Sequence, residues 1–299
     1  MSVVLAMILD AIFGEPKVLW DRFPHPAVLM GKSVAWIDNR FNQGQFRQDK
    51  GIAAFGTLAV AYMFGGWLLA CLPGGLAEVI VGAILLAQQS LVDHVRAVAV
   101  ALRQSLPEGR RAVGMIVGRD TSALDDSAVA RAAIESAAEN FSDGVIAPLF
   151  WFLVGGLPGL LLYKITNTAD SMIGYRTPRH EQFGWAAARF DDLLNLIPAR
   201  LTALMFWLMT RNRVPFADIC YDASLHRSPN AGWPEAALSR YLGVALSGPR
   251  SYHGEMKDYP WVNPDGRAAA MPTDIDNACF ALWRAWWIAF GVALLIAII

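Results

Sequence analysis

The sequence predicts an all-α fold: a polytopic integral membrane bundle of helices, with helical hairpins broken by Pro/Gly turns. Two observations lead to this fold class. The 299-residue chain is 55% hydrophobic and only 17% charged, whereas soluble domains carry about 25% charged residues. Its apolar residues also come in long blocks, as expected where the bilayer is the solvent. These blocks are 51–72, 76–92, 144–163, 196–210 and 281–299.

The composition also limits the function classes. The net charge of −1 gives no reason to expect a nucleic-acid partner. The three cysteines show neither metal-ligand spacing nor a disulfide framework. The first residues lack a basic region and a cleavage site, and we interpret them as mature protein. No linker divides the chain, so we expect 1–299 to be a single membrane-embedded helical domain with cytoplasmic polar segments.

Two Pro/Gly clusters interrupt the apolar blocks, "LPGG" at 72–75 and "GGLPG" at 155–159. Because Pro and Gly end a helix and turn the chain, they predict helical hairpins over 52–100 and 145–175. Neither turn carries Lys or Arg, whereas the open ends do, so the positive-inside rule puts the open ends in the cytoplasm. The block 196–210 is short for a span of about 20 residues. We expect it to lie in the interface or within the bundle, which keeps all polar segments on one side.

Local signals predict several helix ends. Asp125 or Asp126 is placed to cap an Ala-rich helix that extends to about residue 141. "SPN" at 228–230 indicates a turn, and Pro234 lies at the start of the helix that follows.

The Ala-rich helix carries an acidic stripe. Glu135 and Glu139 stand four residues apart on one face, and Asp143 continues that face if the helix persists. Carboxylates in line repel one another and need a cation, either Mg²⁺ or a basic side chain. An acidic face exposed to solvent is the alternative, and these residues alone leave both open.

The segment "YKITNTADSMIGYR" (163–176) places polar side chains directly after an apolar block. On a helix they form two adjacent stripes. One stripe is Lys164, Thr168 and Ser171; the other is Asn167, Asp170 and Gly174. Gly174 leaves room for a group to approach the backbone. Such a set at the mouth of a membrane bundle favours a functional site, and an intramembrane hydrogen-bonded network that joins helices is the alternative.

The segment "RFDDLLNLIPARLT" (189–202) offers a third set. Asp191 and Asp192 with Asn195 make a plausible ligand set for Mg²⁺ and phosphate, because hard oxygen ligands suit this ion. An ordinary helix N-terminus with acidic residues facing its dipole would look the same. Arg200 follows near the acidic pair, after Pro198.

Together these motifs are similar to one family. "FGEP…HP…G", "GRDT", "ESAAENFSDGVIAPLF", "YKITNTADSMIGY", "FGWAAARFDDLLNLIPAR" and "SPNAGWPEAA" occur in order from about residue 10 to 254. The chain resembles the CobD/CbiB cobalamin-biosynthesis family, the adenosylcobinamide-phosphate synthases. The resemblance covers most of the chain, and its motifs are highly specific in combination.

The resemblance implies an enzyme of the cell inner membrane with several spans and a cytoplasmic active site. Such an enzyme condenses cobyric acid with aminopropanol or its O-phosphate, forming an amide on the free propionate of the corrin ring. It uses ATP as cosubstrate and Mg²⁺. Membrane lipid and other membrane enzymes of cobalamin biosynthesis are the further partners expected. Because the chain lacks a Walker A motif and a Gly-rich dinucleotide fingerprint, the ATP site must be built differently.

The resemblance supplies positions, and the roles are our hypothesis. The catalytic candidates are Glu135, Glu139, Lys164 and Asp170. The candidates for binding substrate or ATP are His25, Arg119, Asp120, Asn140, Asn167, Ser171, Arg176, Asn195, Arg200, Asn230 and Glu235. The metal candidates are Asp143, Asp191 and Asp192. Two alternatives stay open, a metal-dependent intramembrane prenyl or phosphate transferase and a non-enzymatic transporter or sensor.

Overall fold

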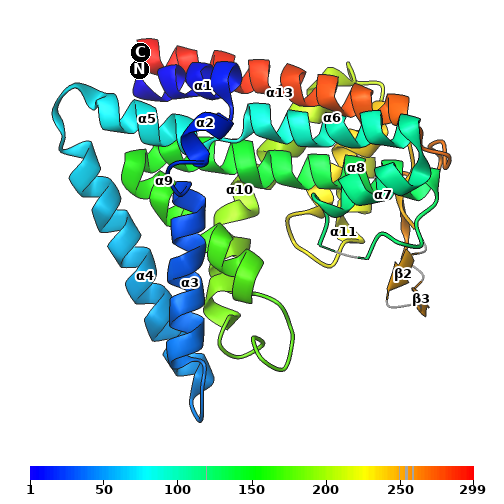
Figure 1. The fold of residues 1–299 in the computed structure, drawn as a ribbon. Coiled ribbons are helices and arrows are strands. Elements are labelled where there is room, and N and C mark those ends of the chain that lie inside the picture. The colour runs from blue at the N-terminus through cyan, green and yellow to red at the C-terminus, as the bar shows by residue number, and fades with distance from the viewer. Residues whose placement is uncertain (119, 249, 253–254, 258) are drawn as a thin grey trace. The chain divides into compact units, whose positions relative to one another are not determined.

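A computed structural model describes residues 1–299 except 119, 249, 253–254 and 258. The chain is almost entirely helical (Figure 1). The first helices are α1 (Ser2–Phe13), α2 (Lys17–Trp20), α3 (Pro26–Phe41), α4 (Arg47–Ala70), α5 (Leu76–Leu85), α6 (Gln88–Gln104) and α7 (Leu106–Gly114). They are followed by α8 (Asp126–Phe141), a π-helical turn (Ser142–Ile146), α9 (Ala147–Ile173), α10 (Trp185–Met209), α11 (Phe216–Ser224), α12 (Gly232–Leu242) and α13 (Pro272–Ile298).

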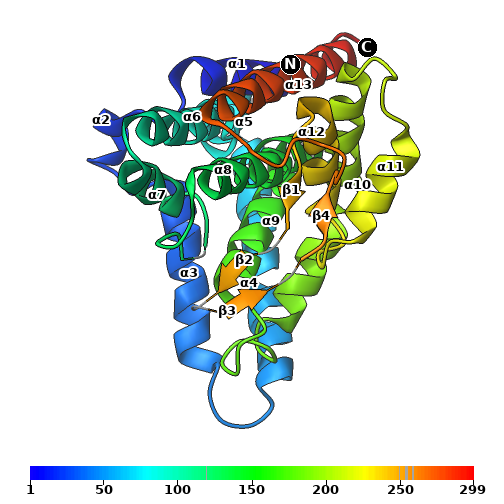
Figure 2. The same cartoon turned by 90° about the vertical axis from the view of Figure 1, so that its right-hand side faces the viewer.

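Four short strands form two antiparallel pairs between α12 and α13. β1 (Leu246–Ser247) pairs with β4 (Trp261–Val262), and β2 (Arg250–Tyr252) pairs with β3 (Glu255–Lys257). Figure 2 shows β1 and β4 beside α12. These strands are the departure from the predicted all-helical fold, and they lie within the polar stretch that precedes the last apolar block.

Among the residues that the structure describes, five helical stretches are long and apolar enough to cross a membrane, so the expected multi-pass membrane protein is confirmed in composition and length. They are Arg47–Ala70, Pro73–Gln104, Asp126–Ile173, Trp185–Met209 and Pro272–Ile298. The block 196–210 is the second half of the 25-residue α10. Its shortness is therefore no argument against a span, and that step of the sequence analysis is wrong.

The chain divides into two compact units. The first comprises 1–89, 147–195 and 292–299, and the second comprises 90–146 and 196–291. The single domain remains a prediction.

In the first unit, both Pro/Gly turns form where the sequence predicts them. A short 3₁₀ turn (Pro73–Gly75) joins α4 to α5, and the two helices diverge from it (Figure 1). Gly156 breaks α9 with φ 60°. A Cβ atom on Gly159 would collide with the carbonyl of Trp151, so the chain reverses there. The reversal brings Ala147 and Tyr163 into one buried cluster with Leu194, as expected for a helical hairpin.

Small residues let the helices of the first unit approach closely. A Cβ atom on Gly66 of α4 would lie 2.8 Å from the backbone carbonyl oxygen of Leu157 on α9. A Cβ atom on Gly82 of α5 would lie 2.9 Å from the Cβ of Ala6 on α1. Such contacts are typical of helices that pack within a membrane, where association depends on close van der Waals contact.

The second unit is built around α8, which buries most of its residues. Asp222 of α11 is fully buried, and Nε of Arg240 on α12 donates to its Oδ2 at 2.7 Å. The backbone N–H of Asn263, next to β4, donates to the same oxygen at 3.1 Å. A buried carboxylate needs a paired cation and hydrogen bonds, and these contacts fasten the strand segment to α11 and α12.

Candidate functional site

The second arm of α9, after Gly156, and the first half of α10 carry a hydrogen-bonded chain. The Tyr163 hydroxyl donates to Oδ1 of Asn195 at 3.0 Å. Nδ2 of Asn195 donates to Oδ2 of Asp191 at 2.9 Å, and Nδ2 of Asn167 approaches Oδ1 of Asp191 at 3.4 Å. Three of the predicted residues, Asn167, Asp191 and Asn195, are therefore brought together, with Tyr163 as a fourth member that the sequence analysis missed.

Two further carboxylates adjoin this chain. Asp170, one turn after Asn167 on α9, interacts electrostatically with Asp191 and Asp192. Nη1 of Arg189 lies 3.3 Å from Oδ2 of Asp192. Within the described residues, no side chain donates a hydrogen bond to the Asp170 carboxylate. Three acids beside one another attract a cation.

Gly174 makes the position of Asp170 possible. A Cβ atom on Gly174 would collide with Oδ1 of Asp170. The room predicted at this glycine is thus confirmed, and the group that uses it is the Asp170 carboxylate. Ser171 and Arg176 are exposed beside it, and Arg176 also interacts electrostatically with Asp192.

These carboxylates suit a hydrated magnesium ion better than a metal held by protein alone. In the part of the chain that the structure describes, no three His, Cys, Asp or Glu side chains are arranged to hold a metal. Mg²⁺ usually keeps several waters and binds one or two carboxylates together with substrate phosphates. Asp170 with Asp191 or Asp192 fits that requirement. Asp143, the other metal candidate, lies in the second unit.

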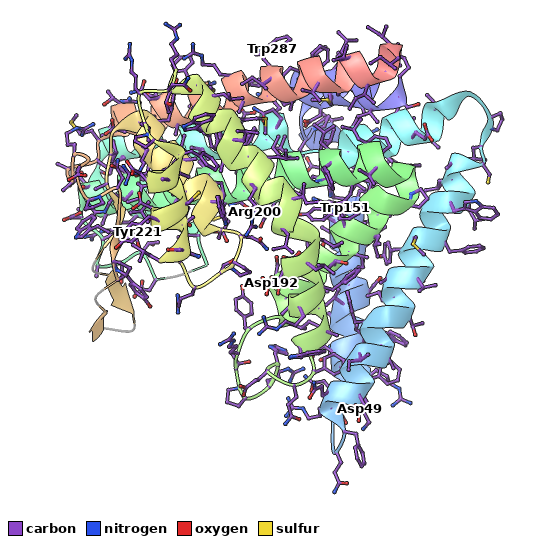
Figure 3. All side chains as sticks on the ribbon, turned by 180° about the vertical axis from the view of Figure 1, so that it is seen from behind. Asp49, Trp151, Asp192, Arg200, Tyr221 and Trp287 are labelled. Atoms are coloured by element: carbon purple, nitrogen blue, oxygen red, sulfur yellow. The ribbon has the colours of Figure 1, made fainter. Side chains whose placement is uncertain are left out.

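Trp151 supports this site from the first arm of α9. Its Nε1 donates to the carbonyl of Leu194 at 3.0 Å, directly before Asn195 (Figure 3). The bond ties the hairpin to α10 at the level of the polar chain. Both hairpin arms therefore hold α10 in register, Trp151 from one side and Tyr163 from the other.

Lys164 and His25 belong to a second polar group of the first unit. His25 caps α3, its Nδ1 accepting from the backbone N–H of Ala27 at 3.1 Å. Its ring lies edge-on to Trp20, with centroids 4.5 Å apart. Lys164 interacts electrostatically with His25 and with the buried Asp10. Asp10 is a residue to which the sequence analysis gave no role.

In the second unit, the acidic stripe of α8 divides into two environments. Asp125 caps α8, as predicted, by accepting from the backbone N–H of Ala128 at 2.7 Å. Glu135 is buried, and its Oε1 accepts from the backbone N–H of Ser247 at 2.7 Å. Glu139 is exposed. The α-helical spacing also ends before Asp143, because a π-helical turn begins at residue 142 and widens the helix. The condition for Asp143 to continue this face, an unbroken α-helix, is therefore not met, and its place on the face remains a prediction.

Asn140 and Asp120, two of the binding candidates, make hydrogen bonds to residues close to them in sequence. Nδ2 of Asn140 donates to the carbonyl and hydroxyl oxygens of Ser136 at 2.8 and 3.0 Å. Oδ1 of Asp120 accepts from the backbone N–H of Ser122 at 2.9 Å. Arg119 lies outside the described residues.

The predicted turn at 228–230 forms and is held by Arg200. Nη1 of Arg200 donates to Oδ1 of Asn230 at 2.9 Å, and Nη2 donates to the carbonyl of Pro229 at 3.2 Å. The guanidinium carbon lies 4.7 Å from the ring centroid of Trp233. Two candidates that the sequence treats separately, Arg200 and Asn230, therefore belong to one cluster (Figure 3 labels Arg200).

Glu235, near the start of α12, faces His226 across this turn. Its Oε1 lies 3.9 Å from Nε2 of His226. Next to them is a cavity of about 40 Å³, lined by Leu225, His226, Arg227, Ser247, Tyr259, Pro260 and Val262. It has room for little more than water. His226 and Arg227 were missed, although they directly precede the "SPN" motif.

The fold and these clusters define a class: a multi-pass helical membrane protein whose acidic and amide side chains gather on the helices that carry its sequence motifs. Comparison with known proteins gives the family. The model of the CobD/Cbib protein family matches residues 3–282, and the chain belongs to that family. No solved structure matches it.

Several relatives are similar over nearly their full length, and each carries the name "Cobalamin biosynthesis protein CobD". The protein of Brucella suis biovar 1 (strain 1330) is 47% identical over 308 residues, covering 97% of this chain and 94% of the relative. The protein of Rhizobium meliloti (strain 1021) is 48% identical, covering 95% and 92%. A protein of Rhodobacter capsulatus is 48% identical, covering 89% and 88%.

Proposed function

We propose that this chain is a membrane enzyme of cobalamin biosynthesis that joins aminopropanol or its O-phosphate to the free propionate of adenosylcobyric acid, using ATP. The role in cobalamin biosynthesis follows from the family and from the relatives' names. The observation that carries the finer proposal is the cluster on α9 and α10, where Asp170, Asp191 and Asp192 adjoin two asparagine amides.

The chemistry explains why such a cluster is needed. A carboxylate does not form an amide readily at neutral pH, so its oxygen first takes the γ-phosphoryl group of ATP and ADP leaves. The amine nitrogen then forms the C–N bond as the bond to the phosphate oxygen breaks, and a base takes the proton. The negative charge of the moving phosphoryl group needs stabilisation. Mg²⁺ on Asp170 and Asp191 or Asp192 would supply that stabilisation.

The residues of this chain have the following proposed tasks. Asp191 is oriented by Asn195 and Asn167, which fixes where a metal ion is received. Asp170 offers a carboxylate to which no described side chain donates a hydrogen bond. Arg176, exposed at the end of the motif, is placed to meet a phosphate arriving from solvent. Oε1 of Glu135 already accepts a backbone hydrogen bond, so in a catalytic role the remaining lone pairs of its carboxylate would act.

We further propose that the enzyme lies in the inner membrane with its active site towards the cytoplasm. ATP is cytoplasmic, and the open ends of the hairpins carry the basic residues that the positive-inside rule assigns to that side. In this orientation the turns at 73–75 and 155–159 face the opposite side.

The test is an assay on purified, detergent-solubilised protein. It receives adenosylcobyric acid and Mg²⁺, with or without ATP and with either amine, and the corrinoid products are identified by mass. We expect an amide product that requires ATP. Turnover without ATP, or no product with either amine from folded protein, would overturn the proposal. Binding of a prenyl diphosphate with Mg²⁺ would instead support the transferase alternative.

A further inference from the structure

The break that ends α5, in the first unit, gathers an unusual set of buried polar groups. α5 ends at Leu85 and α6 starts at Gln88, with Leu86 in extended conformation between them. The first N–H groups of α6 need acceptors. Asp10 of α1, only 2% exposed, supplies one, because its Oδ2 accepts from the backbone N–H of Gln88 at 3.0 Å.

Several polar atoms beside this cap are buried and have no partner among the described residues. The side chain of Gln88 is completely buried, and neither its amide oxygen nor its amide nitrogen makes a hydrogen bond. The same holds for Nε1 of Trp20 and Nε2 of His25. The ring of His25 also lies close to the backbone of Ile84, near the end of α5. Unpaired buried polar atoms are rare in native proteins, so four in one neighbourhood indicate a ligand.

The tautomer of His25 follows from its role as the N-cap of α3. Nδ1 accepts the Ala27 N–H, so this nitrogen carries no proton. Burial lowers the pKa of His25, and the ring is neutral with its proton on Nε2. Nε2 of His25 and Nε1 of Trp20 are therefore two neighbouring N–H donors. The Gln88 amide adds a donor and an acceptor, and the Asp10 carboxylate adds an acceptor.

The charges favour a cation. Glu15 and Lys164 each interact electrostatically with both Asp10 and His25, which places all four groups in one neighbourhood. When Asp10 is ionised, the described charged groups that these interactions name are two acids and one lysine, with a net charge of −1. An ammonium group is attracted by this balance, whereas the two charges of a phosphate are repelled.

One of these polar groups, Lys164, lies on the same helix as Asp170. Lys164 and Asp170 lie six residues apart on one arm of α9, which is about 9 Å along the helix axis. A small amine held beside Lys164 would thus be within reach of a corrin propionate bound at Asp170.

We propose that Asp10, Trp20, His25, Gln88 and Lys164, called the Asp10 cluster from here on, bind the amine substrate as a short β-amino alcohol. Its ammonium group lies against Asp10 and the Gln88 amide oxygen, and its hydroxyl oxygen accepts from the N–H groups of Trp20 and His25. The inference rests on the proposed function and assigns its amine subsite.

The test measures binding of 1-amino-2-propanol to the full-length protein by calorimetry, and the amine KM in the synthase assay. Gln88→Leu keeps the size of a side chain that makes no hydrogen bond in the structure. His25→Asn keeps an N-cap acceptor but removes the Nε2 donor. We expect both variants to weaken amine binding and to raise the amine KM at least tenfold, with the KM values for ATP and corrinoid unchanged. Gln43→Leu, in the exposed loop after α3, is the matched control and should change nothing.

The outcomes separate this inference from the proposed function. Normal amine KM and binding in both variants, in a wild-type protein that makes the amide, would overturn the assignment of the Asp10 cluster alone. Amine binding that depends on Gln88 in a protein that makes no amide would keep the Asp10 cluster and overturn the synthase. We expect the free amino alcohol to bind at least tenfold more tightly than its O-phosphate, and the reverse order would overturn the assignment of the hydroxyl.

Discussion

The Tyr163 hydroxyl donates a 3.0 Å hydrogen bond to Oδ1 of Asn195, and both side chains are buried. This bond fixes the orientation of the Asn195 amide, whose nitrogen then points at Asp191. The Tyr163 hydroxyl thus fixes the orientation of the Asp191 carboxylate through the Asn195 amide that lies between them. Positioning of this kind makes an active site sensitive to residues that do not touch the substrate.

Tyr163→Phe tests that relationship. The change removes one hydroxyl and leaves a buried acceptor unpaired, so we expect a loss of about 1–3 kcal/mol in the free energy of unfolding. We also expect a lower kcat, because the Asn195 amide can rotate away from Asp191. Thermal unfolding in detergent and synthase kinetics check both effects. A stable variant with unchanged kcat would show that Asp191 is held in another way.

Asp170→Asn tests the carboxylate cluster with minimal change of shape. We expect a fall in kcat of at least a hundredfold and a higher Mg²⁺ concentration for half-maximal activity, because the cluster loses one negative charge. Asp49→Asn is the matched control, since Asp49 is exposed near the start of α4 (Figure 3). Equal activity of the two variants would remove Asp170 from the site. Circular dichroism and size exclusion verify that both proteins fold.

The sequence predicts best what depends on neighbouring residues. The turns at 73–75 and 155–159, the Asp125 cap and the turn at 228–230 are all local, and all form as predicted. The Asp191–Asn195 bond also follows from a spacing of four residues on a helix.

Contacts that join distant segments could not be predicted in this way. Asp10 lies 78 residues from Gln88, and Glu135 lies 112 residues from Ser247. Neither Gln88 nor Ser247 lies in one of the sequence motifs. Both donate through a backbone N–H, which any residue except proline would offer. The prediction for Asp143 depended on an unbroken α-helix, and a π-helical turn replaces the α-helix from residue 142.

The Arg200 cluster gives a prediction about stability. Arg200→Lys keeps the charge but loses the planar group that contacts Asn230, Pro229 and the Trp233 ring. We expect the free energy of unfolding to fall by about 1–2 kcal/mol. The KM for ATP of the folded variant then tests the predicted binding role directly. A raised KM would support that role, and an unchanged KM would leave Arg200 as a residue that only holds the turn.

Asp38 of α3 provides a pH dependence. Burial alone would raise the pKa of its carboxyl, but hydrogen bonds from Arg179 and Asn42 outweigh burial and lower the pKa below 3.8. The stabilisation is therefore fully present above the unfolded value of about 3.8 and is lost as the pH falls through the lower folded value. Arg179→Ala should lower the melting temperature at pH 6 and have a smaller effect below pH 3. An equal decrease at both pH values would exclude the ion pair as the cause.

The orientation in the membrane can be measured with a native cysteine. Cys71 is exposed directly before the turn at 73–75, whereas Cys279 is buried. If that turn faces away from the cytoplasm, a membrane-impermeant maleimide should label Cys71 in intact spheroplasts of a Cys220→Ser variant. A cysteine introduced at Gln43, in the loop at the other end of α4, should react only after the membrane is opened. Labelling of Gln43→Cys in intact spheroplasts, with Cys71 protected, would reverse the orientation and place the open ends of the hairpins outside the cytoplasm.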